Sequence, residues 1–162
     1  MKQILGIHSN FNQNIFESGH AWITLTHNNI TTSYGLWPDN HPKTKDNKDS
    51  SDIRIGLEPH AGMANRYYIL TDKQYNKFRQ LLNNNVEWFY TNNCSSWASM
   101  VIARIFDIDI DADDYFGIET PRELGYNINK LEKINPTSIK APRKIKDLKS
   151  SLERKEVKEL LK

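Results

Sequence analysis

The sequence has one cysteine and almost no excess of charge, and each scarcity excludes a class of protein. One cysteine among 162 residues cannot form an internal disulfide or a cysteine-rich zinc site. The net charge of +2 at pH 7 is too small to indicate nucleic-acid binding, and the basic residues are not combined with an aromatic platform. We therefore expect neither a disulfide-dependent fold nor a nucleic-acid partner.

Long hydrophobic segments are also missing. Residues 1–8 contain a short apolar run, but no stretch reaches the length of a signal peptide's hydrophobic region or of a membrane-spanning helix. The sequence predicts a soluble protein without a signal peptide. If this protein acts outside the cell that makes it, a dedicated secretion system must deliver it. A chain of this length predicts one main folded domain.

Alternating apolar residues in the first half of the chain predict strands. Residues 20–26 alternate in the way typical of a half-buried strand, and the Asn-rich turn that follows leads into a partner strand at 30–36. Three further strands are predicted at 3–8, 53–57 and 66–70. The polar segment 40–51 is predicted to be a mobile loop.

Helices are predicted in the second half. Thr71 with Gln74 forms a capping box at the start of one helix, Cys94 begins the next, and Thr-Pro at 120–121 begins a third. The acidic segment 107–114 resembles the start of a calcium loop, but the required glycine and closing glutamate are out of place, so a solvated loop is preferred. The expected fold class is α+β, with an antiparallel sheet packed on the helix that carries the cysteine.

The chain changes character after a predicted domain at 1–138. Residues 139–162 combine Lys and Arg with regularly spaced Ile, Leu and Val, which indicates a basic amphipathic tail. This tail would be either a helix packed on the domain, or a frayed solvated end, or a segment that contacts a membrane surface or a partner.

Cys94 is the candidate nucleophile because it lies where a polar stretch becomes an apolar helix. Unpaired N–H groups and partial positive charge at a helix N-terminus favour the thiolate, which is the nucleophilic form. The alternative is a small buried core residue. Polar neighbours and the presence of His20 favour catalysis. The Cys94 backbone N–H could form an oxyanion hole, with Asn93 and Ser95 as neighbours in the site.

His20 is the candidate base, since it begins a predicted strand. A third group should orient its imidazole ring, and we expect that group on the neighbouring strand within 31–34. Tyr34 and Ser33 point to opposite faces there, so only one of them can serve. Tyr34 is the residue we select. His8 on the first predicted strand is an alternative.

The order of these motifs resembles a known family. Gly-His-Ala-Trp at 19–22, Tyr-Gly-Leu-Trp-Pro at 34–38 and Asn-Cys at 93–94 are similar to motifs of the circularly permuted NlpC-type papain-like cysteine hydrolases. This superfamily includes lecithin:retinol acyltransferase-like enzymes. In ordinary NlpC-type peptidases the cysteine precedes the histidine, whereas here the histidine comes first. The resemblance extends from Ile4 to Asn129. The sequence also resembles small toxin domains found on type VI secretion cargo. In those domains the same motifs are followed by a helix that begins with Thr-Pro, as at 120–121 here.

The resemblance implies a permuted papain-like fold in which Cys94 is the nucleophile and His20 the base. Tyr34 stands near the position where the family has a second histidine or polar residue. The implied reaction cleaves or transfers an acyl group through a thioester and needs no cofactor. Zinc is not expected either, because His20 and His27 have no third ligand at suitable spacing.

The implied biological role is that of an antibacterial effector toxin acting on the cell envelope, with an immunity protein as its partner. The permuted order favours lipid acyl esters, as in a phospholipase. A peptidoglycan amidase or endopeptidase is the alternative, and an inactive binding or adaptor domain is an alternative of another class. Trp22 and Trp37 could line an acyl site, although core packing is the commoner role of aromatics. The tail at 139–162 could contact anionic head groups.

Overall fold

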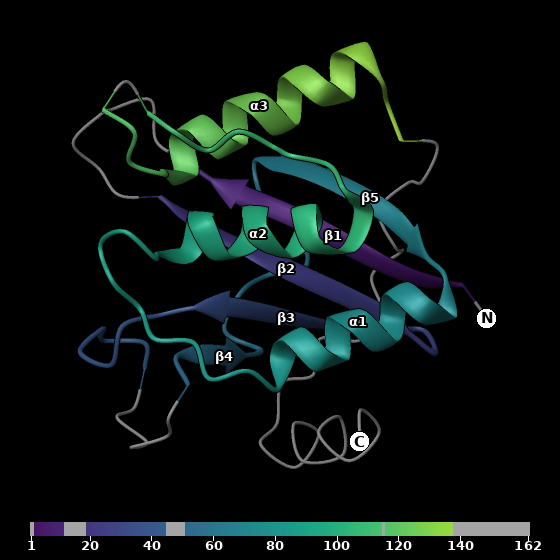
Figure 1. Cartoon of the computed structure of the whole chain (residues 1–162), viewed down its shortest axis with the longest axis horizontal. Helices are drawn as coiled ribbons and strands as arrows, with labels where there is room; N and C mark the ends of the chain where they lie inside the picture. The colour runs from purple at the N-terminus through teal and green to yellow at the C-terminus, as the bar shows by residue number, and fades with distance from the viewer. Residues whose placement is uncertain (1, 12–18, 45–50, 115, 138–162) are drawn as a thin grey trace.

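The computed structural model describes residues 2–11, 19–44, 51–114 and 116–137. Within these ranges the chain is α+β: an antiparallel sheet of five strands, in the order β4-β3-β2-β1-β5, carries three helices on one face (Figure 1). The strands are β1 (Gln3–Asn10), β2 (His20–His27), β3 (Ile30–Leu36), β4 (Ile53–Ile55) and β5 (Ala64–Leu70). The helices are α1 (Asp72–Leu82), α2 (Cys94–Phe106) and α3 (Pro121–Ile134).

The hairpin of β2 and β3 confirms the sequence prediction. Its turn places Asn28 and Asn29 at φ values of 49° and 64°, in the left-handed region that asparagine tolerates better than most residues. However, β2 is not half-buried as expected, because both of its faces are covered. Ile23 lies in the main hydrophobic core, while Trp22 and Thr24 are also buried on the opposite face. The central position of β2 in the sheet is consistent with this burial.

Capping residues define where each helix begins. Thr71 and Gln74 form the predicted capping box of α1, and Thr120 caps α3 by accepting a hydrogen bond from the N–H of Glu123. Asn93 caps α2. The apolar side of α2 contributes Trp97, Ala98, Val101 and Ile102 to the core. Because α2 packs along β2, the N-terminus of this helix has a fixed position at one end of the sheet.

Several predicted boundaries shift. The first strand runs to Asn10, the fourth ends at Ile55, and the fifth begins at Ala64. Residues 139–162 and the middle of the 40–51 loop lie outside the described ranges. Within those ranges, no cluster of three or more His, Cys, Asp or Glu side chains could hold a metal ion. None of the helices found there is long and apolar enough to cross a bilayer.

Candidate active site

His20 and Cys94 meet at one end of the sheet, where β2 and α2 both begin (Figure 1). The two side chains lie close enough for each to shift the pKa of the other. The Nε2 atom of His20 is already bound to Oε1 of Glu58 at 2.9 Å, so Nδ1 is the ring nitrogen that remains for Cys94. The two residues selected from the sequence as nucleophile and base are therefore neighbours.

Glu58 is the group that contacts the other side of the imidazole. It lies between β4 and β5, and its side chain is only 2% exposed. Its Oε1 atom accepts hydrogen bonds from His20 Nε2 and, at 2.6 Å, from Trp37 Nε1. Its backbone N–H donates to Ser33 Oγ at 3.3 Å. A carboxylate held in this way fixes the orientation of the ring and stabilises its protonated form.

The protonation states of His20 and Cys94 depend on each other. Burial alone would lower the pKa of His20, but the hydrogen bonds and charges of Cys94 and Glu58 outweigh burial and raise this pKa to about 9. Burial would likewise raise the pKa of Cys94. Its interactions with His20, the Ala21 N–H and the Ser95 hydroxyl lower it instead. The pair therefore favours a thiolate facing an imidazolium, which is the reactive form of a nucleophilic cysteine.

Two tryptophans enclose the His20 ring. Trp22 stacks on it with the ring centroids 5.9 Å apart, and Trp37 lies against it at 4.0 Å. Both indoles are held by hydrogen bonds, from Trp22 Nε1 to the carbonyl of Pro59 and from Trp37 Nε1 to Glu58. Both are also buried. The two tryptophans expected to line an acyl site thus pack around the base, where they restrict its rotation.

Tyr34 does not contact His20. It pairs with Ile23 across the hairpin, and residues directly opposite each other share a face of the sheet. That face carries the hydrophobic core, where Tyr34 lies edge-on to Phe78 and where burial raises the pKa of its phenol. Tyr34 therefore lies on the opposite face of the sheet from His20, and its selection as the orienting group was wrong. Ser33 lies on the His20 face but contributes only indirectly, by accepting a hydrogen bond from the backbone N–H of Glu58.

Sequence reasoning missed Glu58 because no periodic pattern links it to His20. After β4 the chain passes β3 and β2 on its way to β5 at the opposite edge of the sheet, which brings Glu58 to His20 although 38 positions separate them. One signal was present in the sequence. A glycine inside a strand often marks a close approach, and a Cβ atom on Gly35 would collide with Glu58 Oε1 and crowd His20 Nε2.

His8, the other residue considered for the orienting role, lies behind Trp22. The two rings stack with centroids 5.4 Å apart. Its Nδ1 must donate to Asn65 Oδ1 at 2.7 Å, because an amide oxygen can only accept, and its Nε2 accepts from Thr24 Oγ1 at 2.8 Å. Burial lowers the pKa of His8 to about 4. His8 is therefore a neutral residue that braces Trp22.

The neighbours of Cys94 have separate tasks. Asn93 Oδ1 accepts from the N–H groups of Ser95 and Ser96 at 2.9 and 3.3 Å, and its Nδ2 donates to two carbonyls, so its amide serves as the helix cap. Ser95 Oγ lies 3.9 Å from Cys94 Sγ. The N–H of Cys94 makes no hydrogen bond to any residue in the described part of the chain. It is the available donor for an oxyanion.

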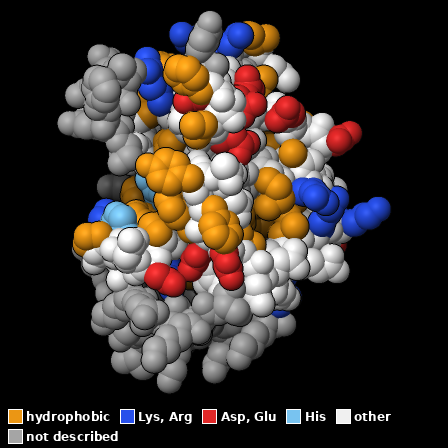
Figure 2. All heavy atoms as spheres, turned by 60° about the vertical axis from the view of Figure 1, so that its left-hand side comes forward, with side chains coloured by type: hydrophobic (Ala, Val, Ile, Leu, Met, Phe, Trp, Pro, Cys, Tyr) orange, Lys and Arg blue, Asp and Glu red, His pale blue; other side chains and the backbone are white. Residues whose placement is uncertain are grey.

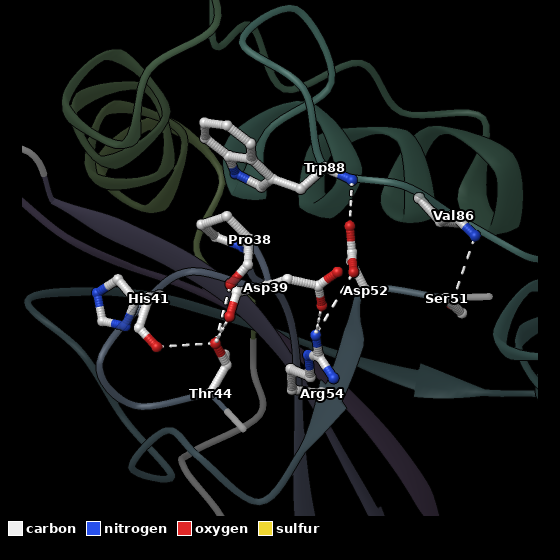
Figure 3. A network of polar contacts seen from close by, with 9 residues as sticks. All are labelled: Pro38, Asp39, His41, Thr44, Ser51, Asp52, Arg54, Val86 and Trp88. Carbon is white, nitrogen blue, oxygen red and sulfur yellow. Dashed lines mark hydrogen bonds and ion pairs between the residues drawn. The ribbon is translucent and has the colours of Figure 1, made fainter. Parts of the chain in front are cut away.

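A polar network holds the segment leading to Cys94 against the loop that carries Trp37 (Figure 3). Asp52 is its centre: its carboxylate accepts from the N–H of Trp88 at 2.7 Å, and its carbonyl accepts from the N–H of Trp37 at 3.0 Å. Arg54 forms ion pairs with Asp39 and Asp52. The two segments flanking the site are therefore fixed to each other.

Apolar side chains gather on the surface at this end of the molecule. Figure 2 shows several of them together on the face that corresponds to the left-hand side of Figure 1, where α2 begins. The segments just before α2 and α3 contribute four exposed apolar side chains, Phe89, Tyr90, Phe116 and Ile118. The nucleophile thus lies next to an apolar surface.

Comparisons with protein-family models, with curated proteins and with solved structures give no match for this chain.

Proposed function

We propose that this protein is a cysteine-dependent acyl hydrolase with a permuted papain-like arrangement, in which Cys94, His20 and Glu58 form the catalytic group. The observation that carries the proposal is the position of His20, which contacts the thiol on one side and a buried carboxylate on the other. A nucleophile, a base and a group that orients the base are the three parts that acyl transfer by a side chain requires.

The first half of the reaction forms a thioester. The Cys94 thiolate attacks the carbonyl carbon of the acyl substrate, and the N–H of Cys94 donates a hydrogen bond to the developing oxyanion. As the tetrahedral intermediate collapses, the bond to the leaving group breaks. The His20 imidazolium gives its Nδ1 proton to that group, which departs as an alcohol or amine. Glu58 keeps the ring in position throughout.

The second half regenerates the enzyme. Neutral His20 accepts a proton at Nδ1 from a water molecule, whose oxygen attacks the thioester carbonyl. When the second tetrahedral intermediate collapses, the carbon–sulfur bond breaks and Cys94 leaves as a thiolate. The product is a carboxylic acid, and the thiolate–imidazolium pair is restored. One water is consumed for each acyl bond broken.

The apolar surface beside Cys94 favours lipid acyl esters as substrates. The motifs at 19–22, 34–38 and 93–94 support the same class, because they resemble permuted NlpC-type hydrolases carried as type VI secretion toxins. On this proposal the protein is an antibacterial phospholipase-like effector that acts in the envelope of a target cell and is neutralised by an immunity protein.

Product analysis tests this proposal directly. Purified wild-type protein and its Cys94→Ala and His20→Ala variants are incubated separately with phospholipid vesicles and with peptidoglycan, and the products are identified by mass spectrometry. We expect fatty acid and lysophospholipid from the wild type, with a loss of at least about a thousandfold in either variant. Peptidoglycan fragments would instead indicate an amidase. No product from either substrate, together with an unreactive Cys94, would indicate a binding domain.

A further inference from the structure

Four large apolar side chains, which we call the aromatic rim, project from two turns near the start of α2. They are Phe89, Tyr90, Phe116 and Ile118, and they are 54%, 78%, 84% and 44% exposed. Exposed apolar patches of this kind mark interaction sites more often than isolated surface residues do. Figure 2 shows apolar groups with acidic side chains above and below them on this face.

Hydrogen bonds within each turn hold the rim in place. Phe89 and Asn92 exchange two backbone hydrogen bonds of 3.0 Å around Tyr90. In the other turn, Asp114 Oδ1 accepts from the N–H groups of Phe116 and Ile118 at 2.8 and 3.0 Å. These bonds fix the backbone positions from which the rim side chains project.

One asparagine connects the two turns to the nucleophile. Asn93 Nδ2 donates to the carbonyl of Tyr90 at 3.2 Å and to that of Glu119 at 2.8 Å. The same residue caps α2 and directly precedes Cys94. Whatever contacts the aromatic rim is consequently held at a fixed position relative to the thiolate.

The charges around the rim indicate which surface it fits. The charged residues described in segments 87–93 and 113–120 are all acidic: Glu87, Asp113, Asp114 and Glu119. Acidic side chains are repelled by anionic lipid head groups, but they can approach the ammonium groups of zwitterionic lipids. Aromatic side chains also favour the boundary between head groups and acyl chains.

We propose that the aromatic rim docks on the surface of a zwitterionic lipid bilayer and presents the acyl ester of a bound lipid to Cys94. The second part of this inference rests on the proposed hydrolase function, whereas the docking itself does not. Cys94 is 9% exposed, so an ester can react only where it is delivered closely to the start of α2. Docking through the rim brings the lipid to that place.

Vesicle binding by an inactive protein tests the docking. Full-length Cys94→Ala protein is the parent, and it is sedimented with pure phosphatidylcholine vesicles. Three further proteins carry Cys94→Ala together with Tyr90→Ser, with Phe116→Ser, or with both. Removing either side chain should weaken binding about tenfold, because each buries a large apolar group in the interface. The matched control is Ile134→Ser, since Ile134 is 72% exposed at the end of α3; it should bind like its parent.

Three results would overturn the docking proposal: no binding of Cys94→Ala to phosphatidylcholine, unchanged binding by the doubly substituted rim, or an equal loss in the Ile134→Ser control. Self-association that the rim substitutions abolish, without vesicle binding, would assign the rim to a protein interface. Turnover of a soluble short-chain thioester by proteins that retain Cys94 tests the hydrolase separately. The wild type should cleave it, and failure of the wild type would reject the hydrolase and leave the binding result intact.

Discussion

The Nε2 atom of His20 lies 2.9 Å from Oε1 of Glu58, and the same carboxylate oxygen also accepts a hydrogen bond from Trp37. With two donors on one oxygen, the carboxylate cannot rotate without breaking both bonds. The other oxygen, Oε2, is buried and has no hydrogen-bond partner in the described residues. Burying an unpaired carboxylate oxygen costs free energy. That cost is consistent with a functional role in which the negative charge of Glu58 stabilises the His20 imidazolium.

Replacing Glu58 by Gln should therefore lower activity without removing the hydrogen bonds. Glutamine keeps an oxygen that can accept from His20 and Trp37, but it has no negative charge to stabilise the imidazolium. We expect kcat/KM to fall by at least about tenfold and the basic limb of the pH–rate profile to move to lower pH. Glu132→Gln is the matched control, because Glu132 pairs with Arg66 on another part of the sheet. A shift of equal size in that control would contradict the role of Glu58.

The reactivity of Cys94 should show its coupling to His20. The pKa of this thiol is lowered by His20, so alkylation of the wild type should have its inflection below the usual range of a free thiol. In His20→Ala the interaction is lost and burial remains, so the inflection should move upward. Alkylation rates with iodoacetamide, measured from pH 5 to 10, provide the comparison. Identical inflections in the two proteins would show that the thiol is not coupled to His20.

The same coupling predicts how stability depends on pH. The pKa of His20 is raised in the folded protein from 6.5 to about 9. Because the folded state binds this proton more tightly than the unfolded state, the stabilisation is complete below pH 6.5 and is lost as the pH rises through about 9. Cys94 contributes with the opposite sign, because its lowered pKa stabilises the folded state more as the pH rises toward the value of a free thiol. The two contributions offset each other, so the melting temperature of the wild type should change little between pH 6.5 and about 9. In His20→Ala the buried thiol has no imidazolium partner, so the melting temperature should fall as the pH rises past the range of a free thiol, and equal profiles in the two proteins would contradict the coupling.

Much of the fold was accessible from the sequence because local patterns determine it. The Asn-Asn turn, the capping pair of Thr71 and Gln74, and the start of α2 at Cys94 each depend on residues within a few positions of one another. The pairing of His20 with Cys94 could be inferred for the same reason, since each residue begins its own element. The burial of β2 on both faces could not be inferred from the sequence, because it depends on which distant segments pack on the central strand.

The third member of the site required information that no local pattern contains. Glu58 reaches His20 because β4 pairs with β3 at one edge of the sheet and the next segment passes β3 and β2 toward β5 at the other edge. Tyr34 was the wrong choice because the register between β2 and β3 places it opposite Ile23, and a shift of one residue reverses the face on which each side chain lies.

Gly35 should be essential to the geometry of the site. A Cβ at this position would overlap the Glu58 carboxylate and lie close to the His20 ring, so Gly35→Ala should displace Glu58 and reduce kcat/KM by about tenfold or more. The sheet itself should persist, since alanine is compatible with an extended backbone. Circular dichroism checks the fold and thioester turnover checks the site. The collision should also lower the melting temperature of Gly35→Ala, and adding Glu58→Asp, which shortens the colliding side chain, should restore part of that loss. Full activity of the single variant would contradict the close packing.

The tail at 139–162 gives a last prediction, which follows from its sequence. Its Lys and Arg residues alternate with Leu, Ile and Val, a pattern found in segments that lie on anionic surfaces. Each basic residue near such a surface contributes up to about 1 kcal/mol, and salt screens this attraction. Deleting the tail should therefore weaken binding to vesicles containing phosphatidylglycerol, most strongly at low salt, while binding to pure phosphatidylcholine through the aromatic rim and turnover of a soluble thioester stay nearly unchanged. If the tail instead covers the core, deletion will lower the melting temperature and the turnover of every substrate together. Four measurements on the truncated protein decide between these outcomes: sedimentation with each vesicle type, thermal melting and thioester turnover. If the tail binds membranes, only binding to the phosphatidylglycerol vesicles should fall, while the other three values stay nearly unchanged.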